Sequence, residues 1–476
     1  MKNKLSVFIL SLFSVVSVFA QNALTTINVT GSLVTVDSYV DNEVIIDGAT
    51  ELHLTSKTPL TNSVVRLNSD DSWLYFDNLR PQQVIDSYLS KIYVKGTLAS
   101  YRSNCRVAIY GTGAVVIPHS SSFGPLTVYK DQNFGGDSTN GYTLFARYTS
   151  LGAFDNSIRS FKLKKGYMVT FATASDGTGY SRVFIADKND IEVPVVPDLL
   201  DKKISFIRVL QWEWVTKKGW CGSDPNEYLA MNATWRYDWS AGGSTTAAVE
   251  YVPIRQNGGW PGWGEINGKE YVSHVLGFNE PDHTEQSNLT VAQALAQWPD
   301  MMRTGLRIGS PAVTNNNWLY QFMDSCKANN YRVDFVAYHA YWGGKSPVNW
   351  YNDLKAIYTR TGRPLWITEW NNGANWTYEW WPADSLSRLQ KQLTDVTAIL
   401  QVLDTASFVE RYSIYNWVED KRAMVISGKL TPAGQYYSAN KSVMAYNPKN
   451  EVIPTFQYRN PSSTIAFGSK NLTLAV

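Results

Sequence analysis

Two patterns of apolar and polar positions divide the chain near residue 200. Before it, short apolar runs such as Val44-Ile45-Ile46 and Ile92-Tyr93-Val94 recur about every 15–25 residues, separated by Asn, Asp, Ser and Gly. Runs of this length between such residues predict short β-strands joined by turns. After residue 200, strand-like apolar runs alternate with stretches of helical periodicity. That alternation is typical of a parallel α/β fold.

Eight strands and five helices are predicted in the segment 201–445. Eight strands in about 245 residues are the number and length of a TIM (β/α)8 barrel. The predicted strands are Ile204–Gln211, Ala233–Tyr237, Ala248–Ile254, His274–Asn279, Leu306–Ser310, Val333–His339, Leu365–Glu369 and Arg411–Trp417. The predicted helices are Val291–Arg303, Trp318–Asn329, Trp350–Thr361, Asp384–Leu403 and Pro432–Val443.

The remaining segments give a multidomain chain with a β-rich N-terminal half. Residues 21–120 form a β-rich domain, for which a short β-solenoid and a β-sandwich both remain open. Residues 121–193 form a second β-module. Residues 194–200 contain two prolines and are predicted to be a linker. Residues 446–476 are predicted to be a C-terminal β extension.

The first twenty residues have the pattern of a secretory signal peptide. Lys2 and Lys4 precede an apolar run, and small residues end at Ala20. Cleavage before Gln21 would release a secreted or periplasmic protein. The rest of the chain has no apolar run of about 18 residues, so we expect no membrane insertion of the mature protein.

Composition and charge indicate which kinds of ligand the protein is expected to bind. The chain has 43 Lys and Arg against 41 Asp and Glu, a net charge of +2, which provides no electrostatic reason to expect nucleic acid as a ligand. Aromatic residues make up 13% of the chain and include 18 Trp, of which only Trp73 precedes residue 200. Large cores and carbohydrate-stacking surfaces both use Trp heavily.

Metal and cofactor chemistry has no support in the sequence. There are only 5 His, and no pair has metal-ligand spacing. Cys105, Cys221 and Cys326 are too few and too widely spaced for a disulfide scaffold, although a single Cys221–Cys326 bridge is compatible with their positions. We therefore predict no metal and no cofactor.

Two glutamates stand out because each ends an apolar strand. Glu280 follows the predicted fourth strand and Glu369 ends the predicted seventh. The C-terminal strand ends of a TIM barrel meet at the active-site face, and strands four and seven lie across it from one another. Two carboxylates about 5 Å apart are the machinery of a retaining glycosidase. A single Glu after a strand is common, so the prediction rests on the presence of both Glu280 and Glu369.

Four motifs in order resemble one known family. They are Gly277-Phe278-Asn279-Glu280-Pro281-Asp282, Gly309-Ser310-Pro311-Ala312, Val333 to Tyr341, and Trp366-Ile367-Thr368-Glu369-Trp370. Together they resemble the glycosyl hydrolase catalytic core of glycoside hydrolase family 128 (GH128), a member of the retaining (β/α)8 clan. The resemblance covers roughly 203–440. It implies endo-hydrolysis of β-1,3-glucan such as laminarin or curdlan, with Glu280 as acid/base and Glu369 as nucleophile.

The residues near these glutamates supply the predicted substrate contacts. Asn279 precedes the acid and is placed to bond the sugar 2-OH, and His339 and Tyr341 end strand six beside Glu369. Strand-end and loop tryptophans offer rings for sugar faces. The predicted substrate-binding residues are Asn279, His339, Tyr341, Trp212, Trp260, Trp263, Trp342, Trp370 and Trp417; Trp376 lies on a similar loop.

The module before the linker resembles a βγ-crystallin Greek key. Tyr129, Phe134 and Gly136 correspond to its aromatic-glycine hairpin, and Asp155 to Ser160 to its calcium loop. Arg159 stands where that family has Ser or Thr, and a positive charge opposes a cation there.

The main hypothesis is a secreted, monomeric, retaining endo-glycoside hydrolase that takes a polysaccharide substrate. One alternative keeps this chemistry on another β-linked polymer such as agarose or galactan. A second alternative is a non-catalytic glycan-binding protein, which the presence of both Glu280 and Glu369 opposes.

Overall fold

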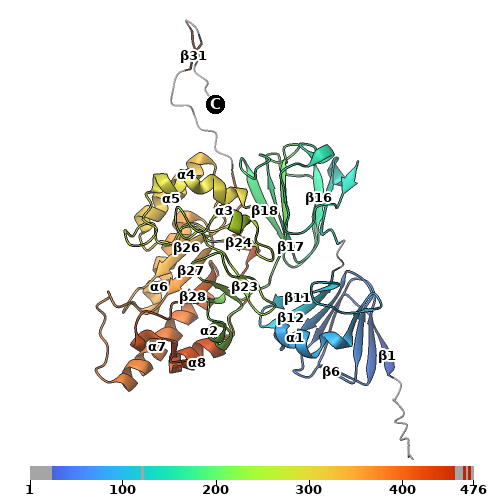
Figure 1. Ribbon diagram of the computed structural model, residues 1–476, viewed down its shortest axis with the longest axis horizontal. Coiled ribbons are helices and arrows are strands. Elements are labelled where there is room, and N and C mark those ends of the chain that lie inside the picture. The colour runs from blue at the N-terminus through green and yellow to red at the C-terminus, as the bar shows by residue number, and fades with distance from the viewer. Residues whose placement is uncertain (1–23, 120–122, 456–464, 468–469, 473–476) are drawn as a thin grey trace, which may run out of the picture.

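The computed structural model describes residues 24–119, 123–455, 465–467 and 470–472. They form two β-rich parts and one α/β part, with the β-rich parts on the right and the α/β part on the left of Figure 1. The predicted signal peptide lies outside the described residues. No helix in the described ranges is long and apolar enough to cross a membrane.

The first β-rich part is a β-solenoid, which decides between the two alternatives left open by the sequence. Parallel pairing places Thr25 opposite Asn42 and Glu43 opposite Val64, so each coil takes about twenty residues. One stack contains β1 (Thr25–Val29), β4 (Asn42–Ile46), β7 (Val64–Leu67), β9 (Ile92–Val94) and the antiparallel β10 (Thr97–Leu98). The other contains β2 (Leu33–Val36), β5 (Thr50–Leu54), β8 (Ser72–Phe76), and the antiparallel β12 (Gly113–Pro118) and β11 (Cys105–Tyr110).

Smaller elements complete these coils. Strands β3 (Tyr39–Val40) and β6 (Leu60–Thr61) pair at the corners, and α1 (Pro81–Ser87) with a 3-10 turn at Leu89–Lys91 lengthens the third coil. Alternate residues of β4, β5 and β7 point inward, among them Val44, Leu52 and Val65, which are fully buried. Stacked coils bury these apolar faces, which no single coil can do alone.

The second β-rich part is a sandwich of two four-stranded antiparallel sheets. One sheet has the order β14 (Ser138–Thr139), β13 (Leu126–Tyr129), β16 (Ser160–Leu163), β19 (Ile191–Val193). The other has the order β15 (Arg147–Tyr148), β20 (Phe206–Gln211), β17 (Tyr167–Ala172), β18 (Ser181–Ala186). The crystallin-like Greek key stays a prediction. In its predicted calcium loop, Arg159 donates to both carboxylate oxygens of Asp201, at 3.1 and 3.3 Å.

The strand predicted over Ile204–Gln211 forms, but it does not begin the α/β part. It is β20, and it pairs antiparallel with the whole of β17, from Tyr167 opposite Gln211 to Ala172 opposite Phe206. The predicted linker also belongs to the sandwich, because Val196 and Leu200 are buried in its core. A strand that is apolar on both faces fits either kind of sheet, so its periodicity could not assign it.

The α/β part contains eight parallel strands, beginning at β21 (Lys218–Cys221). Six of them form one sheet in the order β23 (Glu250–Tyr251), β22 (Trp235–Tyr237), β21, β28 (Val409–Ile414), β27 (Leu365–Trp370), β26 (Val336–Ala340). The pair β24 (His274–Val275) and β25 (Arg307–Ile308) is separate. Single parallel bridges, Ile254 to Leu276 and Gly309 to Phe335, stand between the pair and the sheet. The regular sheets do not close, so they do not confirm the predicted barrel.

Four of the five predicted helices form within a few residues of their predicted bounds, and the fifth ends at Ala439 instead of Val443. Two short helices, Pro225–Ala230 and Trp263–Asn267, were not predicted. The helices lie outside the strands (Figure 1). They begin at good caps: Thr290 forms a capping box with Gln293, and Asn315 and Ser346 accept from the backbone of their first turns. The helices are α2 (Pro225–Ala230), α3 (Trp263–Asn267), α4 (Val291–Arg303), α5 (Asn316–Asn329), α6 (Pro347–Thr361), α7 (Ser385–Thr405) and α8 (Pro432–Ala439).

Charged side chains fill the interior between the strands at their N-terminal ends. Arg307 makes two bonds to Glu410, at 2.5 and 2.9 Å, and Arg411 donates to Glu250 at 2.7 Å. His274 lies 3.1 Å from Glu250. All five side chains are buried. Burial opposes the charge of Glu250, but Arg411 outweighs it and lowers the pKa of Glu250 to about 2. Because each charge has a partner of opposite sign, the fold avoids the free-energy cost of burying an unpaired charge.

The three parts share one continuous core. Trp214 packs against Trp73 and Tyr110 of the solenoid, with ring centroids 5.8 and 5.6 Å apart. Buried Arg106 of the solenoid donates to Gly166 of the sandwich and to Glu213, at 2.7 and 3.0 Å. The β-rich half is therefore joined to the α/β part by buried contacts.

The cysteines and the C-terminal segment complete the fold. Cys105, Cys221 and Cys326 are free and buried, so the Cys221–Cys326 bridge does not form. Of the predicted C-terminal β extension, β31 (Ile465–Phe467) and β32 (Lys470–Leu472) pair antiparallel.

Candidate active site

Glu369 lies near the C-terminal end of β27, and three side chains hold its carboxylate. The Tyr341 hydroxyl donates to one oxygen at 2.5 Å, and the Tyr237 hydroxyl and Trp239 Nε1 donate to the other at 3.0 and 2.8 Å. Glu369 is 6% exposed. Burial, together with the charge of Glu369, raises the pKa of Tyr341 and Tyr237 well above the usual value, so both hydroxyls stay protonated donors. The carboxylate is thus fixed in orientation.

Glu280 lies five residues beyond β24, after a single parallel bridge between Asn279 and Ala312, and has a left-handed backbone conformation with φ = 40°. Its N–H donates to the carbonyl of Ala312 at 2.8 Å, which holds this unusual turn in place. A non-glycine residue with positive φ is often found at functional sites because the surrounding structure must support it. The turn directs the carboxylate toward His339, whose Nδ1 is 2.7 Å away.

His339 joins the two glutamates. Its Nδ1 lies 2.7 Å from Glu280 and 3.4 Å from Glu369. One oxygen of each glutamate and the His339 nitrogen all lie within 4.8 Å of one another. Such a separation brings the two carboxylates close enough to act on one reacting group between them.

Burial and charge pull the titration of this cluster in opposite directions. Burial disfavours the imidazolium of His339, but the negative charges of Glu369 and Glu280 outweigh it and raise its pKa. Burial also disfavours the charged form of Glu280, but the hydrogen bond and charge of His339 prevail and lower its pKa. The proton shared by this pair therefore favours the imidazole over the carboxylate.

The same three side chains could in principle offer ligands to a cation. The contacts oppose that use, because both oxygens of Glu369 accept from O–H and N–H donors and Nδ1 of His339 is engaged by Glu280. Donors directed at a carboxylate compete with a metal for the same lone pairs. The arrangement suits a nucleophilic carboxylate better than a metal ligand.

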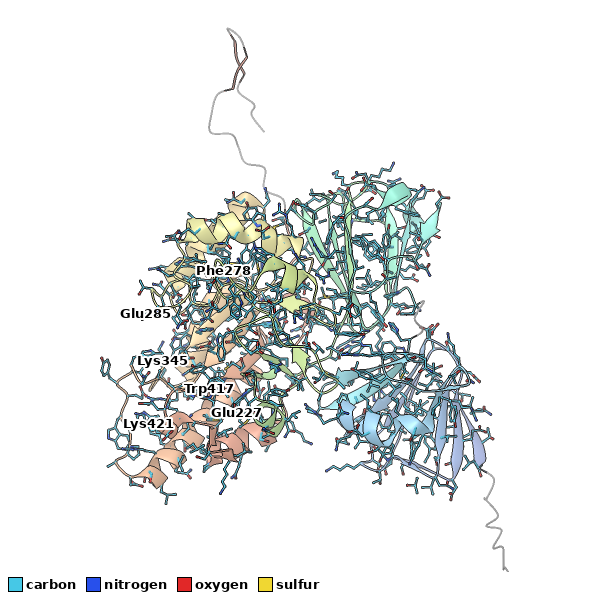
Figure 2. The ribbon with its side chains drawn as sticks, in the orientation of Figure 1. Glu227, Phe278, Glu285, Lys345, Trp417 and Lys421 are labelled. Atoms are coloured by element: carbon cyan, nitrogen blue, oxygen red, sulfur yellow. The ribbon has the colours of Figure 1, made fainter. Side chains whose placement is uncertain are left out.

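Asn279 and Trp417 lie where the sequence predicted substrate contacts. Asn279 is buried and donates to Gln286 at 3.2 Å, while its Oδ1 accepts no hydrogen bond within the described residues. A buried acceptor without a partner is suited to a sugar hydroxyl. Trp417 is 48% exposed and packs beside Trp239 and Tyr415 at 5.6 and 5.4 Å. Figure 2 labels it on the α/β part, away from the two β-rich parts.

Two of the predicted tryptophans are wrong as sugar contacts. Trp212 is 1% exposed and packs on His274, at the N-terminal strand ends. Trp370 is fully buried between Trp350, Tyr412 and Tyr437. Successive strand residues point to opposite sides, so Trp370 turns away from the face that Glu369 occupies. Trp260 is about half exposed, and Trp263 and Trp342 are half-buried under Arg255 and Lys345.

Tyr237 and Trp239 are the site residues that sequence reasoning missed. Tyr237 ends β22 and Trp239 follows two residues later, so both lie at the C-terminal end of this strand, on the active-site face. The available signal was the aromatic alternation Trp235-Arg236-Tyr237-Asp238-Trp239 at a predicted strand end.

Two carboxylates this close, at the C-terminal ends of parallel strands and surrounded by aromatic rings, define a glycoside hydrolase. Residues 215–437, a little under half of the chain, match the family model described as glycosyl hydrolase catalytic core. The match confirms the predicted glycosyl hydrolase catalytic core, and the protein is a glycoside hydrolase. No curated protein matches the chain.

Several solved GH128 structures resemble the chain. A subgroup I endo-β-1,3-glucanase from Amycolatopsis mediterranei, in complex with laminaripentaose, is 27% identical and covers 47% of this chain and 99% of its own, at a TM-score of 0.42. A subgroup II endo-β-1,3-glucanase from Sorangium cellulosum is 23% identical over 47% and 98%, at 0.41. A subgroup VII oligosaccharide-binding protein from Trichoderma gamsii is 22% identical over 47% and 92%, at 0.37.

Proposed function

We propose that the protein is a GH128-type endo-hydrolase that cleaves β-1,3-glucan with retention of anomeric configuration. The observation that carries the proposal is the pair Glu280 and Glu369, with oxygens within 4.8 Å of each other. The four motifs that resemble GH128 support the substrate class. In this proposal the eight parallel strands form a distorted (β/α)8 barrel, and the chain acts outside the cytoplasm as a monomer.

The first half of the reaction forms a bond between the sugar and Glu369. The ionised Glu369 attacks the anomeric carbon, the bond from that carbon to the glycosidic oxygen breaks, and the proton of Glu280 passes to the leaving oxygen. In the second half, Glu280 takes a proton from water. The water oxygen attacks the same carbon and releases Glu369 as a free carboxylate. One water is consumed for each bond cleaved.

His339 supplies the proton that Glu280 needs at the start. The raised pKa of His339 and the lowered pKa of Glu280 place the proton on the imidazole in the free protein, 2.7 Å from the carboxylate oxygen. A proton that moves across this contact as the leaving oxygen gains charge keeps Glu280 competent as an acid.

The test is product release from a panel of laminarin, curdlan, mixed-linkage glucan, agarose and galactan. We expect oligosaccharides from the β-1,3-glucans alone. NMR should show that their new reducing ends have the β configuration when they are first released. Products from agarose or galactan alone would retain the mechanism and replace the substrate. Binding without products from any polymer would favour a non-catalytic glycan-binding protein.

The variant Glu369→Gln is expected to lose turnover by roughly a thousandfold or more, because the amide cannot attack the anomeric carbon. Its affinity for glucan should remain, since the substitution removes the charge but keeps the size of the side chain and one acceptor oxygen for the neighbouring hydroxyls. The measurement is the rate of reducing-end formation beside a binding isotherm. A variant that keeps a tenth of the activity would show that Glu369 is not the nucleophile.

A further inference from the structure

Three exposed aromatic rings project from the loop between β27 and α7. Within Trp376-Thr377-Tyr378-Glu379-Trp380, the rings alternate with polar residues, and Trp376, Tyr378 and Trp380 are 60%, 100% and 74% exposed. We call these three side chains the aromatic stripe. Large exposed aromatic surface on a folded protein commonly marks a binding site.

The polar residues of the same run anchor the loop from below. The Thr377 hydroxyl bonds the backbone of Ala374 at 2.7 and 2.8 Å. Glu379 pairs with the buried Arg422 and accepts from Trp381 Nε1 at 2.9 Å. Alternation then leaves the rings on the outer side. The rings are held in place in advance, which lowers the entropy cost of binding a ligand to them.

The stripe begins next to the nucleophile. The ring of Trp376 lies 5.3 Å from that of Tyr341, the residue that donates to Glu369 at 2.5 Å. From Trp376 the stripe continues outward along the loop to Trp380, beside which Trp381 stacks under Lys391 and Lys421. Figure 2 labels Lys421 and Trp417 on the same part of the molecule.

The chemistry of the surface indicates a neutral glycan. Aromatic faces bind the apolar faces of sugar rings, and here the carboxylate between them, that of Glu379, is already neutralised by Arg422. The stripe itself therefore presents no free charge to an ionic polymer. A ligand chain with its cleavage point at Glu369 has the Trp376 ring as its next contact on this side.

We propose that the aromatic stripe is an extended binding surface that holds a neutral β-linked glucan chain beyond the sugars at the cleavage point. This inference rests on the proposed function for the identity of the glucan. Its consequence is a preference for polymer over short oligosaccharides, because only a longer chain reaches Tyr378 and Trp380.

The experiment measures sedimentation with insoluble curdlan in the Glu369→Gln background, which prevents turnover, and KM on laminarin and laminaritriose in the active protein. Tyr378→Ala/Trp380→Ala is expected to weaken curdlan binding about tenfold. It should raise KM for laminarin relative to laminaritriose by a similar factor. Leu386→Ala, which removes a 77% exposed aliphatic side chain nearby, is the matched control and should change neither.

The single variant Tyr378→Ala tests the proposal without disturbing the fold, because a fully exposed ring makes no packing contact that could be lost. Curdlan binding that stays within twofold in both variants would overturn the proposal. So would self-association of the parent that the variants abolish, since the stripe would then cover a second copy. If the active protein releases no products but binds curdlan through the stripe, the proposed hydrolysis fails while the binding surface stands.

Discussion

At the scale of single residues, the site is organised by donors on Glu369 and a proton shared by Glu280 and His339. The two glutamates therefore differ in surroundings: Tyr237, Trp239 and Tyr341 donate to one carboxylate, and His339 lies in hydrogen-bond contact with the other. This difference in hydrogen-bond partners supports the proposed roles of Glu369 as nucleophile and Glu280 as acid.

Tyr341→Phe is expected to lower kcat about tenfold or more, because Glu369 loses its shortest hydrogen bond and a charged acceptor is left partly unsatisfied. Tyr338→Phe is the control: its hydroxyl donates to the carbonyl of Thr314 from the same strand, β26, and touches neither glutamate. The measurement is kcat on laminarin for both variants. Equal effects of the two substitutions would show that the loss reflects the strand and not the contact to Glu369.

His339→Gln is expected to move the alkaline limb of the kcat/KM profile to lower pH. The wild-type cluster keeps its proton on His339, whose pKa is raised above 6.5, whereas the variant can keep it only on the Glu280 carboxyl, whose ordinary pKa is 4.5. The measurement is kcat/KM against pH on laminarin. An unchanged limb would show that His339 does not control the ionisation of Glu280.

The same pair also links pH to stability. The contribution of His339, whose folded pKa is raised from 6.5, is complete below that value and is lost as pH rises through the folded pKa. The contribution of Glu280, whose folded pKa is lowered from 4.5, is complete above that value and is lost as pH falls through the folded pKa. The contact therefore stabilises the fold most between these two values.

At the scale of elements, two successive lysines cap two helices. Buried Lys217 donates to the carbonyls of Leu403, Asp404 and Ala406 at the end of α7. Buried Lys218 does the same for Tyr437, Ser438 and Asn440 at the end of α8. An ammonium group at this position satisfies carbonyls that the helix leaves free and opposes the negative end of its dipole. Lys218, the first residue of β21, and Lys217 directly before it thus fix both helices against the sheet.

Lys218→Met is expected to lower the free energy of unfolding by about 2 kcal/mol, because it leaves the three carbonyls at the end of α8 without their donor. Lys441→Met, at an exposed position close to the same helix, should change it by less than about 0.5 kcal/mol. Guanidinium unfolding followed by circular dichroism measures both. A Lys218 variant as stable as the Lys441 variant would contradict the capping role.

At the scale of the whole molecule, the β-rich half is built into the same core as the α/β part. Strand β20 provides one route, since buried Arg208 on it donates to the carbonyls of Thr304, Asn267 and Lys269. Trp214 provides another, through its contacts to Trp73 and Tyr110. The buried contacts of the solenoid and the sandwich therefore stabilise the α/β part.

Trp214→Ala is expected to lower the free energy of unfolding by about 3 kcal/mol, because it opens a cavity between the solenoid and the rest of the core. In calorimetry, this loss of stability should appear as a single unfolding transition of the whole chain at a lower temperature. Two separate transitions in the variant, with the second at the wild-type temperature, would show that the parts fold independently.

Much of the α/β part was predictable because local patterns decide it. Helices α4 to α7 appear within a few residues of their predicted bounds, since apolar periodicity and capping residues act within one turn. Glu280, Glu369, Asn279 and His339 were predictable too, because residues at the ends of parallel strands meet at one face whatever the loops do.

The features that could not be predicted from the sequence depend on pairing between segments that are far apart in the chain. Strand β20 is apolar on both faces, so only its neighbours in space show that it completes the sandwich and does not begin the α/β part. The parallel stacking of β1, β4 and β7 was equally hidden, because the same short strands suit a solenoid or a sandwich.

By itself, the sequence determined the α/β class, helices α4 to α7 and the meeting of Glu280 and Glu369 at one face, because each rests on residue type and short-range spacing. Only the tertiary structure decided that Trp212 and Trp370 are core, that Tyr237 and Trp239 hold Glu369, and that Trp376, Tyr378 and Trp380 are exposed. Whether an aromatic ring is buried or presented to solvent is set by which elements pack against it, and residues distant in sequence supply those elements.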